Sequence, residues 1–120
     1  MAEQGIEWAV KTGDLEGVKS AVAEGADVNK KDSGVRGSTL LQQAADFGHA
    51  EIIEFLISKG AKIEEKDNFG NNALLNAVYE GHTNAVRVLL KAGANTNVKG
   101  PDGKTPKEAA EKAEIKALFK

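Results

Sequence analysis

Pairs of glycines that lie 12 residues apart recur along the chain, and this feature restricts the possible fold more than any other. The pairs are Gly13 and Gly25, Gly48 and Gly60, and Gly81 and Gly93, with their first members 35 and 33 residues apart. An alanine stands four residues before each first glycine, and another follows each second glycine directly. A period of this length is typical of a stack of short units, each packed on its neighbours.

Each unit has the signals of two short helices. Thr39 to Gln42 and Thr105 to Glu108 have the pattern of capping boxes, and Pro106 stands at a first helical position, where its missing N–H costs nothing. The first glycine of a pair can take the left-handed conformation that ends a first helix. Apolar residues at helical spacing then predict a second helix in each of the first three units: Leu15, Val18 and Val22; Ile52, Ile53, Leu56 and Ile57; Val86, Leu89 and Leu90.

The connections between units are turn sequences. Residues 67–70 (Asp-Asn-Phe-Gly) and 100–103 (Gly-Pro-Asp-Gly) supply the dihedral angles of a tight reversal and predict projecting hairpins. The first connection, 32–37, is two residues longer, so its tip is expected to differ. Arg36 within it is expected to be a solvated loop charge, with an added charge contact as the alternative. The last unit lacks the interhelical glycine. Its second helix is expected to run from about Ala113 to Phe119 and to close the stack.

These patterns resemble ankyrin repeats, which are units of 33 residues with a turn and two helices. The resemblance predicts an all-α ankyrin-repeat solenoid: four helix-turn-helix repeats joined by short β-turn or hairpin loops, with the terminal repeats as caps. We expect one domain over residues 1–120, with repeats at about 1–34, 35–67, 68–100 and 101–120. The second repeat has Thr-Leu-Leu-Gln at 39–42 where Thr-Pro-Leu-His is usual in the family.

Composition and motifs argue against several classes of function. The formal net charge of −2, with acidic and basic residues interspersed, offers no basic field to nucleic acid or to an anionic membrane. The chain has no cysteine and no glycine-rich nucleotide motif. His49 and His82 share one repeat position, so we expect them to form structural hydrogen bonds rather than to act in catalysis. We therefore expect a cytoplasmic protein, with the nucleus left open as a second site, that is a monomer, uses no metal or cofactor and is not an enzyme.

The first helices carry a stripe of candidate contact residues. By the i, i+3, i+4 rule one face of each helix should carry Trp8, Lys11 and Thr12; Gln43, Asp46 and Phe47; or Asn76, Tyr79 and Glu80. That face should look over the concave side of the stack, and Trp and Tyr are enriched at interface hot spots. Two packing alternatives stay open: Trp8 could cover the end of the core, and Phe47 could bend into the groove between repeats. The candidate protein-binding residues are Trp8, Lys11, Asp46, Phe47, Tyr79 and Glu80.

Longer stretches resemble the myotrophin family of four-repeat ankyrin proteins. They include residues 77–82 (AVYEGH) and 98–103 (VKGPDG), and the resemblance spans nearly the whole chain. It implies a cytosolic regulator that binds the heterodimeric actin capping protein and blocks its attachment to filament barbed ends, with Trp8, Asp46, Tyr79 and Glu80 at the family's binding positions. The alternative is a generic or engineered ankyrin scaffold or adaptor that binds a different cytosolic signalling protein through the same face.

Overall fold

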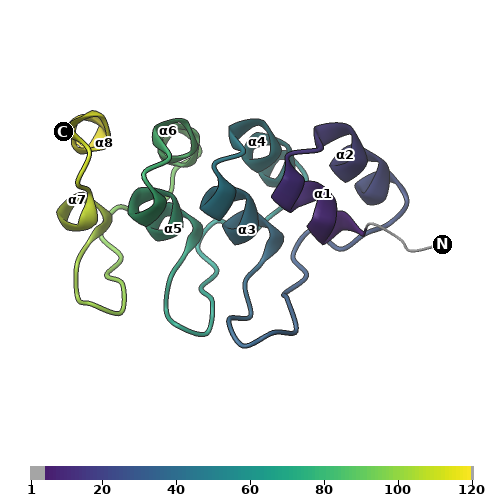
Figure 1. The fold of residues 1–120 in the computed structure, drawn as a ribbon, viewed down its shortest axis with the longest axis horizontal. Helices are drawn as coiled ribbons and strands as arrows, with labels where there is room; N and C mark the ends of the chain where they lie inside the picture. Colours follow the sequence, from purple (N-terminus) through teal and green to yellow (C-terminus); the bar gives the residue numbers. More distant parts are fainter. Residues whose placement is uncertain (1–4, 120) are drawn as a thin grey trace.

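The computed structural model describes residues 5–119 and places them in eight short helices that form four pairs (Figure 1). In chain order the helices are α1 (Ile6–Thr12), α2 (Leu15–Ala23), α3 (Leu40–Phe47), α4 (Ala50–Ser58), α5 (Ala73–Glu80), α6 (Thr83–Lys91), α7 (Pro106–Ala109) and α8 (Ala113–Leu118). The predicted all-α solenoid is therefore confirmed. None of these eight helices is long and apolar enough to cross a bilayer.

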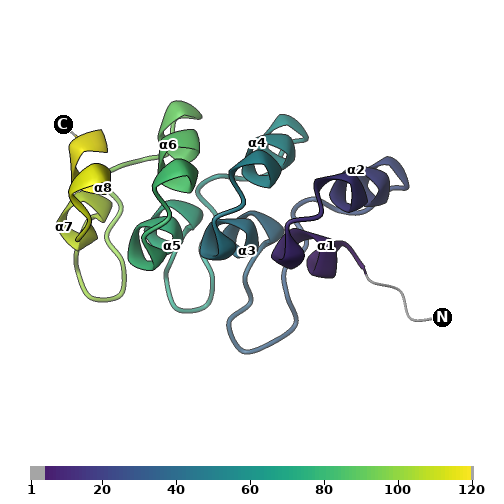
Figure 2. The ribbon, with the colours of Figure 1, turned by 45° about the horizontal axis from the view of Figure 1, so that its top comes forward.

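The helices lie in two layers. The first helices of the pairs, α1, α3, α5 and α7, pack side by side as an inner layer, and α2, α4, α6 and α8 form an outer layer against them (Figure 2). The main contacts of α1 to α6 are with their own partner and with the adjacent pairs, whereas α7 packs chiefly on α5 and α8 on α6. The stack is consequently elongated, with extents of 45 × 26 × 21 Å.

Caps define the ends of the inner helices. The Thr39 hydroxyl accepts the N–H of Gln42, and the Gln42 side chain accepts the N–H of Thr39 at 2.7 Å. The predicted capping box of α3 is therefore present, and Thr105 and Glu108 form the second one at α7. The helices α1, α3 and α5 end at glycines in the left-handed conformation, as predicted. Ala110 is extended instead, so α7 has only four residues.

The core runs between the two layers along the whole stack. Val18, Ile53, Leu56, Val86 and Leu89, which were predicted from the spacing of the outer helices, are completely buried. The inner helices contribute leucines and the small alanines that precede each glycine by four residues, and these alanines allow neighbouring helices to approach closely. Burial of this apolar surface is the main stabilising contribution.

Three connections project from the inner layer, and we call them the first finger (24–39), the second finger (59–72) and the third finger (92–105) (Figure 1). The longer first finger is bonded to the second. The Asn68 N–H donates to the Arg36 carbonyl at 2.8 Å, and the Asn68 side chain donates to the Val35 carbonyl at 3.0 Å. Gly37 permits this approach because its φ is +62° and a Cβ there would lie 2.7 Å from the Asn68 side chain.

An equivalent hydrogen bond joins each unit to the one before it. Nε2 of His49 donates to the carbonyl of Lys11 at 3.0 Å, and Nε2 of His82 donates to the carbonyl of Asp46 at 2.9 Å. In the last unit Lys112 stands at the same place, directly before the outer helix, and its ammonium donates to the Gly81 carbonyl at 2.9 Å. The geometry of the two histidines thus supports the expected role, which is to form structural hydrogen bonds between units.

Candidate functional site

The concave face, which we define as the exposed surface of α1, α3 and α5 together with the fingers beside them, holds the candidate residues. Trp8, Phe47 and Tyr79 are 46%, 52% and 42% exposed, which is unusual for large aromatic side chains in three successive units. Lys11 and Glu80 are also exposed, whereas Asp46 is only partly accessible. The exposure of Phe47 argues against its packing into the groove between repeats, and its ring instead stacks beside that of His49, with 6.3 Å between centroids.

Two residues of the predicted stripe do not reach this face. Gln43 and Asn76 are buried, with 3% and 2% of their surface exposed. Trp8 occupies the equivalent position in the first unit, yet it is half exposed. The interpretation of Gln43 and Asn76 as surface residues was therefore wrong: helical spacing gives the side of a helix but does not reveal how much of that side other segments cover.

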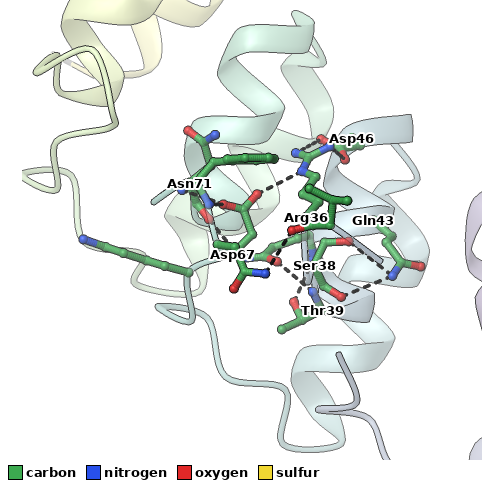
Figure 3. A network of polar contacts seen from close by, with 12 residues as sticks. Arg36, Ser38, Thr39, Gln43, Asp46, Asp67 and Asn71 are labelled. Atoms are coloured by element: carbon green, nitrogen blue, oxygen red, sulfur yellow. Dashed lines mark hydrogen bonds and ion pairs between the residues drawn. The ribbon is translucent and has the colours of Figure 1, made fainter. Parts of the chain in front are cut away.

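A charge network replaces the solvated charge that was expected at Arg36 (Figure 3). Its guanidinium pairs with both oxygens of Asp46, at 2.9 Å from Nη1 and 3.2 Å from Nη2, while its Nε donates to Asp67 at 2.9 Å. The Asp67 side chain is fully buried, and its other oxygen accepts the backbone N–H groups of Phe69 and Asn71. Arg36 therefore links the first finger to α3 and to the second finger.

The surroundings of Asp46 shift its protonation. Burial raises the pKa of its carboxyl group; the Arg36 charge opposes this shift, and the negative charges of Glu80 and Asp67 add to it, so that the net effect is a raised pKa. The pKa of Arg36 is lowered by burial, but its hydrogen bond with Asp67 and the attraction of Asp46 outweigh that effect and raise it overall. The network carries one positive and two negative charges.

Tyr79 is attached to the third finger. Its hydroxyl donates to Oδ1 of Asp102 at 3.0 Å. Burial raises the pKa of Tyr79, and the hydrogen bond and charge of Asp102 raise it further. The pKa of Asp102 is lowered, chiefly by the backbone N–H of Lys104 and also by the Tyr79 hydroxyl. The phenol ring is thus held in one direction while remaining accessible on the concave face.

A groove of about 300 Å³ lies beside Tyr79, where the third unit meets the fourth. Val78 and Ala109, both buried, contribute apolar atoms to its lining, and Glu80 and Glu111 contribute carboxylates. Neither carboxylate forms an ion pair with another of residues 5–119. Lys112 also lines the groove, and its ammonium donates to the Gly81 carbonyl, so the groove combines apolar atoms with side chains of both charges.

Sequence reasoning did not identify Asp67, Asp102 and Glu111 as parts of this face, and it favoured a solvated charge over a contact for Arg36. The longer first connection was a signal for Arg36, because its extra residues bring the guanidinium to α3. No sequence signal indicated Glu111, which follows the extended Ala110 at the end of α7. Among the described residues no cluster of histidine, aspartate and glutamate has the arrangement of a metal site.

Comparison with known proteins agrees with this architecture. The family model for ankyrin repeats, in three copies, matches residues 6–100, so the chain belongs to the ankyrin-repeat family, whose repeats are protein-interaction modules. It is 45% identical to myotrophin of Xenopus tropicalis over 119 residues, which cover 99% of both chains. The chain is thus a member of the myotrophin family, as the sequence indicated.

More distant relatives share only the repeats. An E3 ubiquitin-protein ligase of Drosophila melanogaster is 34% identical over 102 residues, which are 84% of this chain but 4% of that protein. The human BCL-6 corepressor-like protein 1 is 37% identical over 71 residues, which are 58% of this chain and 4% of that protein. Repeats of this kind thus occur within much larger proteins of different function, so the myotrophin match is the informative one.

Proposed function

We propose that this protein binds the heterodimeric actin capping protein, sequesters it sterically from filament barbed ends and so favours filament growth. The observation that carries the proposal is the row of exposed aromatic side chains on α1, α3 and α5, beside the available carboxylate of Glu80. Membership of the myotrophin family over the full chain supports the choice of partner. We further propose that the protein acts in the cytoplasm as a monomer and has no catalytic activity.

The residues of the concave face suit different parts of such a contact. Trp8 and Tyr79 are rigid anchors, because their rings bury a large apolar area at a small cost in conformational entropy. Glu80 supplies the exposed negative charge that steers a basic partner surface. Asp46 would contribute a carboxylate whose charge is partly neutralised, because it is paired with Arg36. Lys11 and Phe47 extend the surface between these groups.

The test is elongation of pyrene-labelled actin from barbed ends in the presence of capping protein. The wild-type chain should restore elongation. Tyr79→Ala should weaken the interaction by about 2 kcal/mol or more, because the ring is an anchor in a patch that loses water on binding. Lys19→Ala is the control: Lys19 is exposed on the outer helix α2, away from the concave face, and its loss should change inhibition little.

Charge reversal gives a second test of the same face. Glu80→Lys should slow association and flatten its dependence on salt, because a steering negative charge is replaced by a positive one. Glu54→Lys makes the same change on an exposed position of the outer helix α4 and should have little effect. Full inhibition by a folded Tyr79→Ala, Glu80→Lys double variant would exclude the concave face. No inhibition by the wild-type chain would exclude capping protein and would favour an adaptor for another protein.

A further inference from the structure

The guanidinium of Arg36 has its donors directed at two carboxylates from different elements. Both terminal nitrogens face Asp46, on the inner helix α3, and Nε faces Asp67, on the second finger, with separations of 2.9 to 3.2 Å. A planar fork that pairs with both oxygens of a carboxylate sets direction as well as distance, which a lysine ammonium cannot do. Arg36 therefore determines how the Asp46 carboxylate is oriented.

Arg36 is itself held at both ends. Its side chain pairs with Asp67, which cannot turn away because it is fully buried and also accepts two backbone N–H groups. Its backbone carbonyl accepts the N–H of Asn68 at 2.8 Å. A side chain anchored in this way loses little conformational freedom when a partner binds, so it can serve as a support for a neighbouring contact residue.

We propose that Arg36 is a positioning residue of the concave face: it holds the Asp46 carboxylate, whose side chain is 17% exposed, in one orientation and leaves Glu80 as the free negative charge beside it. Arg36 acts through Asp46 and not by a contact of its own. The binding part of this inference rests on the proposed function. The orientation and protonation of Asp46 do not rest on it, so the inference and the proposed function can fail separately.

Removal of Arg36 should change Asp46 in a defined direction. The titratable side chains that act on its carboxyl group are Arg36, Asp67 and Glu80, while the His82 ring bonds its backbone carbonyl. Without the guanidinium the two acidic neighbours and burial remain. All three disfavour the carboxylate, so Asp46 should hold its proton to a higher pH than in the wild-type chain.

The first experiment needs no partner. Carboxyl carbon NMR follows the titration of Asp46 in the wild-type chain, in Arg36→Gln and in Lys66→Gln, which removes the same charge from an exposed lysine of the second finger. Arg36→Gln should raise the pKa of Asp46, Arg36→Lys should raise it less, and Lys66→Gln should leave it nearly unchanged. An Asp46 pKa that is the same in Arg36→Gln and in the wild-type chain would overturn the inference. If Arg36→Gln does not fold, Arg36→Lys, which keeps the positive charge, is the test. An Asp46 pKa that is the same in Arg36→Lys and in the wild-type chain would then overturn the inference.

The second experiment is a double-mutant cycle on the affinity for purified capping protein. Arg36→Gln should weaken binding at least about fivefold, as coupled residues of one charge network do. In the Asp46→Asn background the same change should have almost no effect, because the residue that Arg36 positions has lost its charge. An equal loss in both backgrounds would show that Arg36 contacts the partner itself and would overturn the positioning role. If the wild-type chain does not bind, the proposed function fails and the NMR titration alone decides the inference.

Discussion

The hydroxyl of Tyr79, on α5, and the carboxylate of Asp102, at the tip of the third finger, share a hydrogen bond of 3.0 Å. The bond connects a candidate partner-binding ring to a loop that sequence reasoning did not associate with it. Because Asp102 also accepts the backbone N–H of Lys104, the loop conformation and the direction of the ring depend on the same carboxylate. This dependence can be measured directly.

Asp102→Asn should lower the pKa of Tyr79. The amide oxygen keeps the hydrogen bond but the negative charge is lost, so one cause of the raised pKa disappears while burial remains. Asp102→Ala should lower it further. Tyr79 is the single tyrosine of the chain, so absorbance near 295 nm during alkaline titration reports its ionisation. Asp32→Asn, which alters a turn aspartate of the first finger, is the control; equal midpoints in all the variants would contradict the bond.

Asp46 and Asp102 should contribute to the pH dependence of stability with opposite signs. The pKa of Asp46 is raised in the folded state, so its contribution to the free energy of unfolding falls as pH rises from the unfolded-state pKa through the folded one, and is constant above that. The pKa of Asp102 is lowered, so its contribution is present above the unfolded-state pKa and is lost as pH falls through the folded one.

Urea unfolding at a series of acidic pH values measures this difference. Subtracting the Asp46→Asn curve from the wild-type curve should leave a free energy that decreases with pH, and the corresponding subtraction for Asp102→Asn should leave one that increases. Slopes of the same sign for both residues would show that the surroundings of Asp46 are described wrongly. The experiment should be run at low ionic strength, because salt screens the Glu80 contribution.

Gln42→Glu should destabilise the protein by more than about 3 kcal/mol, because it places a charge in a buried site that provides only carbonyl acceptors for its second oxygen. The side chain of Gln42 is 1% exposed, and its amide nitrogen donates to the carbonyls of Glu65 and Asn71 at 2.7 and 3.0 Å. Urea unfolding gives the value. Asn95→Asp is an amide-to-acid change at an exposed site and should cost little; a similar cost for both would contradict the role of Gln42.

His82→Ala should destabilise the chain more than His49→Ala. Both histidines donate to a carbonyl of the preceding unit, but the bond of His82 is partly buried and that of His49 is exposed to water. A buried acceptor that loses its donor costs about 1–3 kcal/mol, whereas an exposed one can bond to water. Thermal and urea unfolding of the two variants test the order, and the reverse order would be inconsistent with the burial of the two contacts.

The repeat architecture could be predicted from the sequence because each signal is local. The glycines at 13, 48 and 81 end helices through their own backbone conformation, and Thr39 caps α3 through a residue three positions away. The spacing also placed Trp8, Phe47 and Tyr79 on the surface of the inner helices. These features depend on a few neighbouring residues, which a single sequence shows.

The parts that could not be predicted depend on contacts between units. Gln43 is buried although its helical position matches that of the exposed Trp8, and its amide donates to Ser38 of the first finger, a contact that helical spacing does not show. The pairing of Arg36 with Asp46 and Asp67 joins three segments, and the sequence does not show that the first finger folds back onto α3. The two additional residues of the first finger indicated that its tip differs from the others, but they did not show which side chains the guanidinium contacts.

The contact between Lys112 and Gly81 makes the last junction of the stack different from the two before it. There the link is a point charge on a flexible four-carbon stem, whereas His49 and His82 provide rigid rings. We therefore expect the fourth unit to be joined less rigidly to the stack than the first three, so that the width of the groove beside Tyr79 can vary while the end that bears Trp8 keeps its shape. Tolerance for partners of different width would then reside at one end of the molecule only.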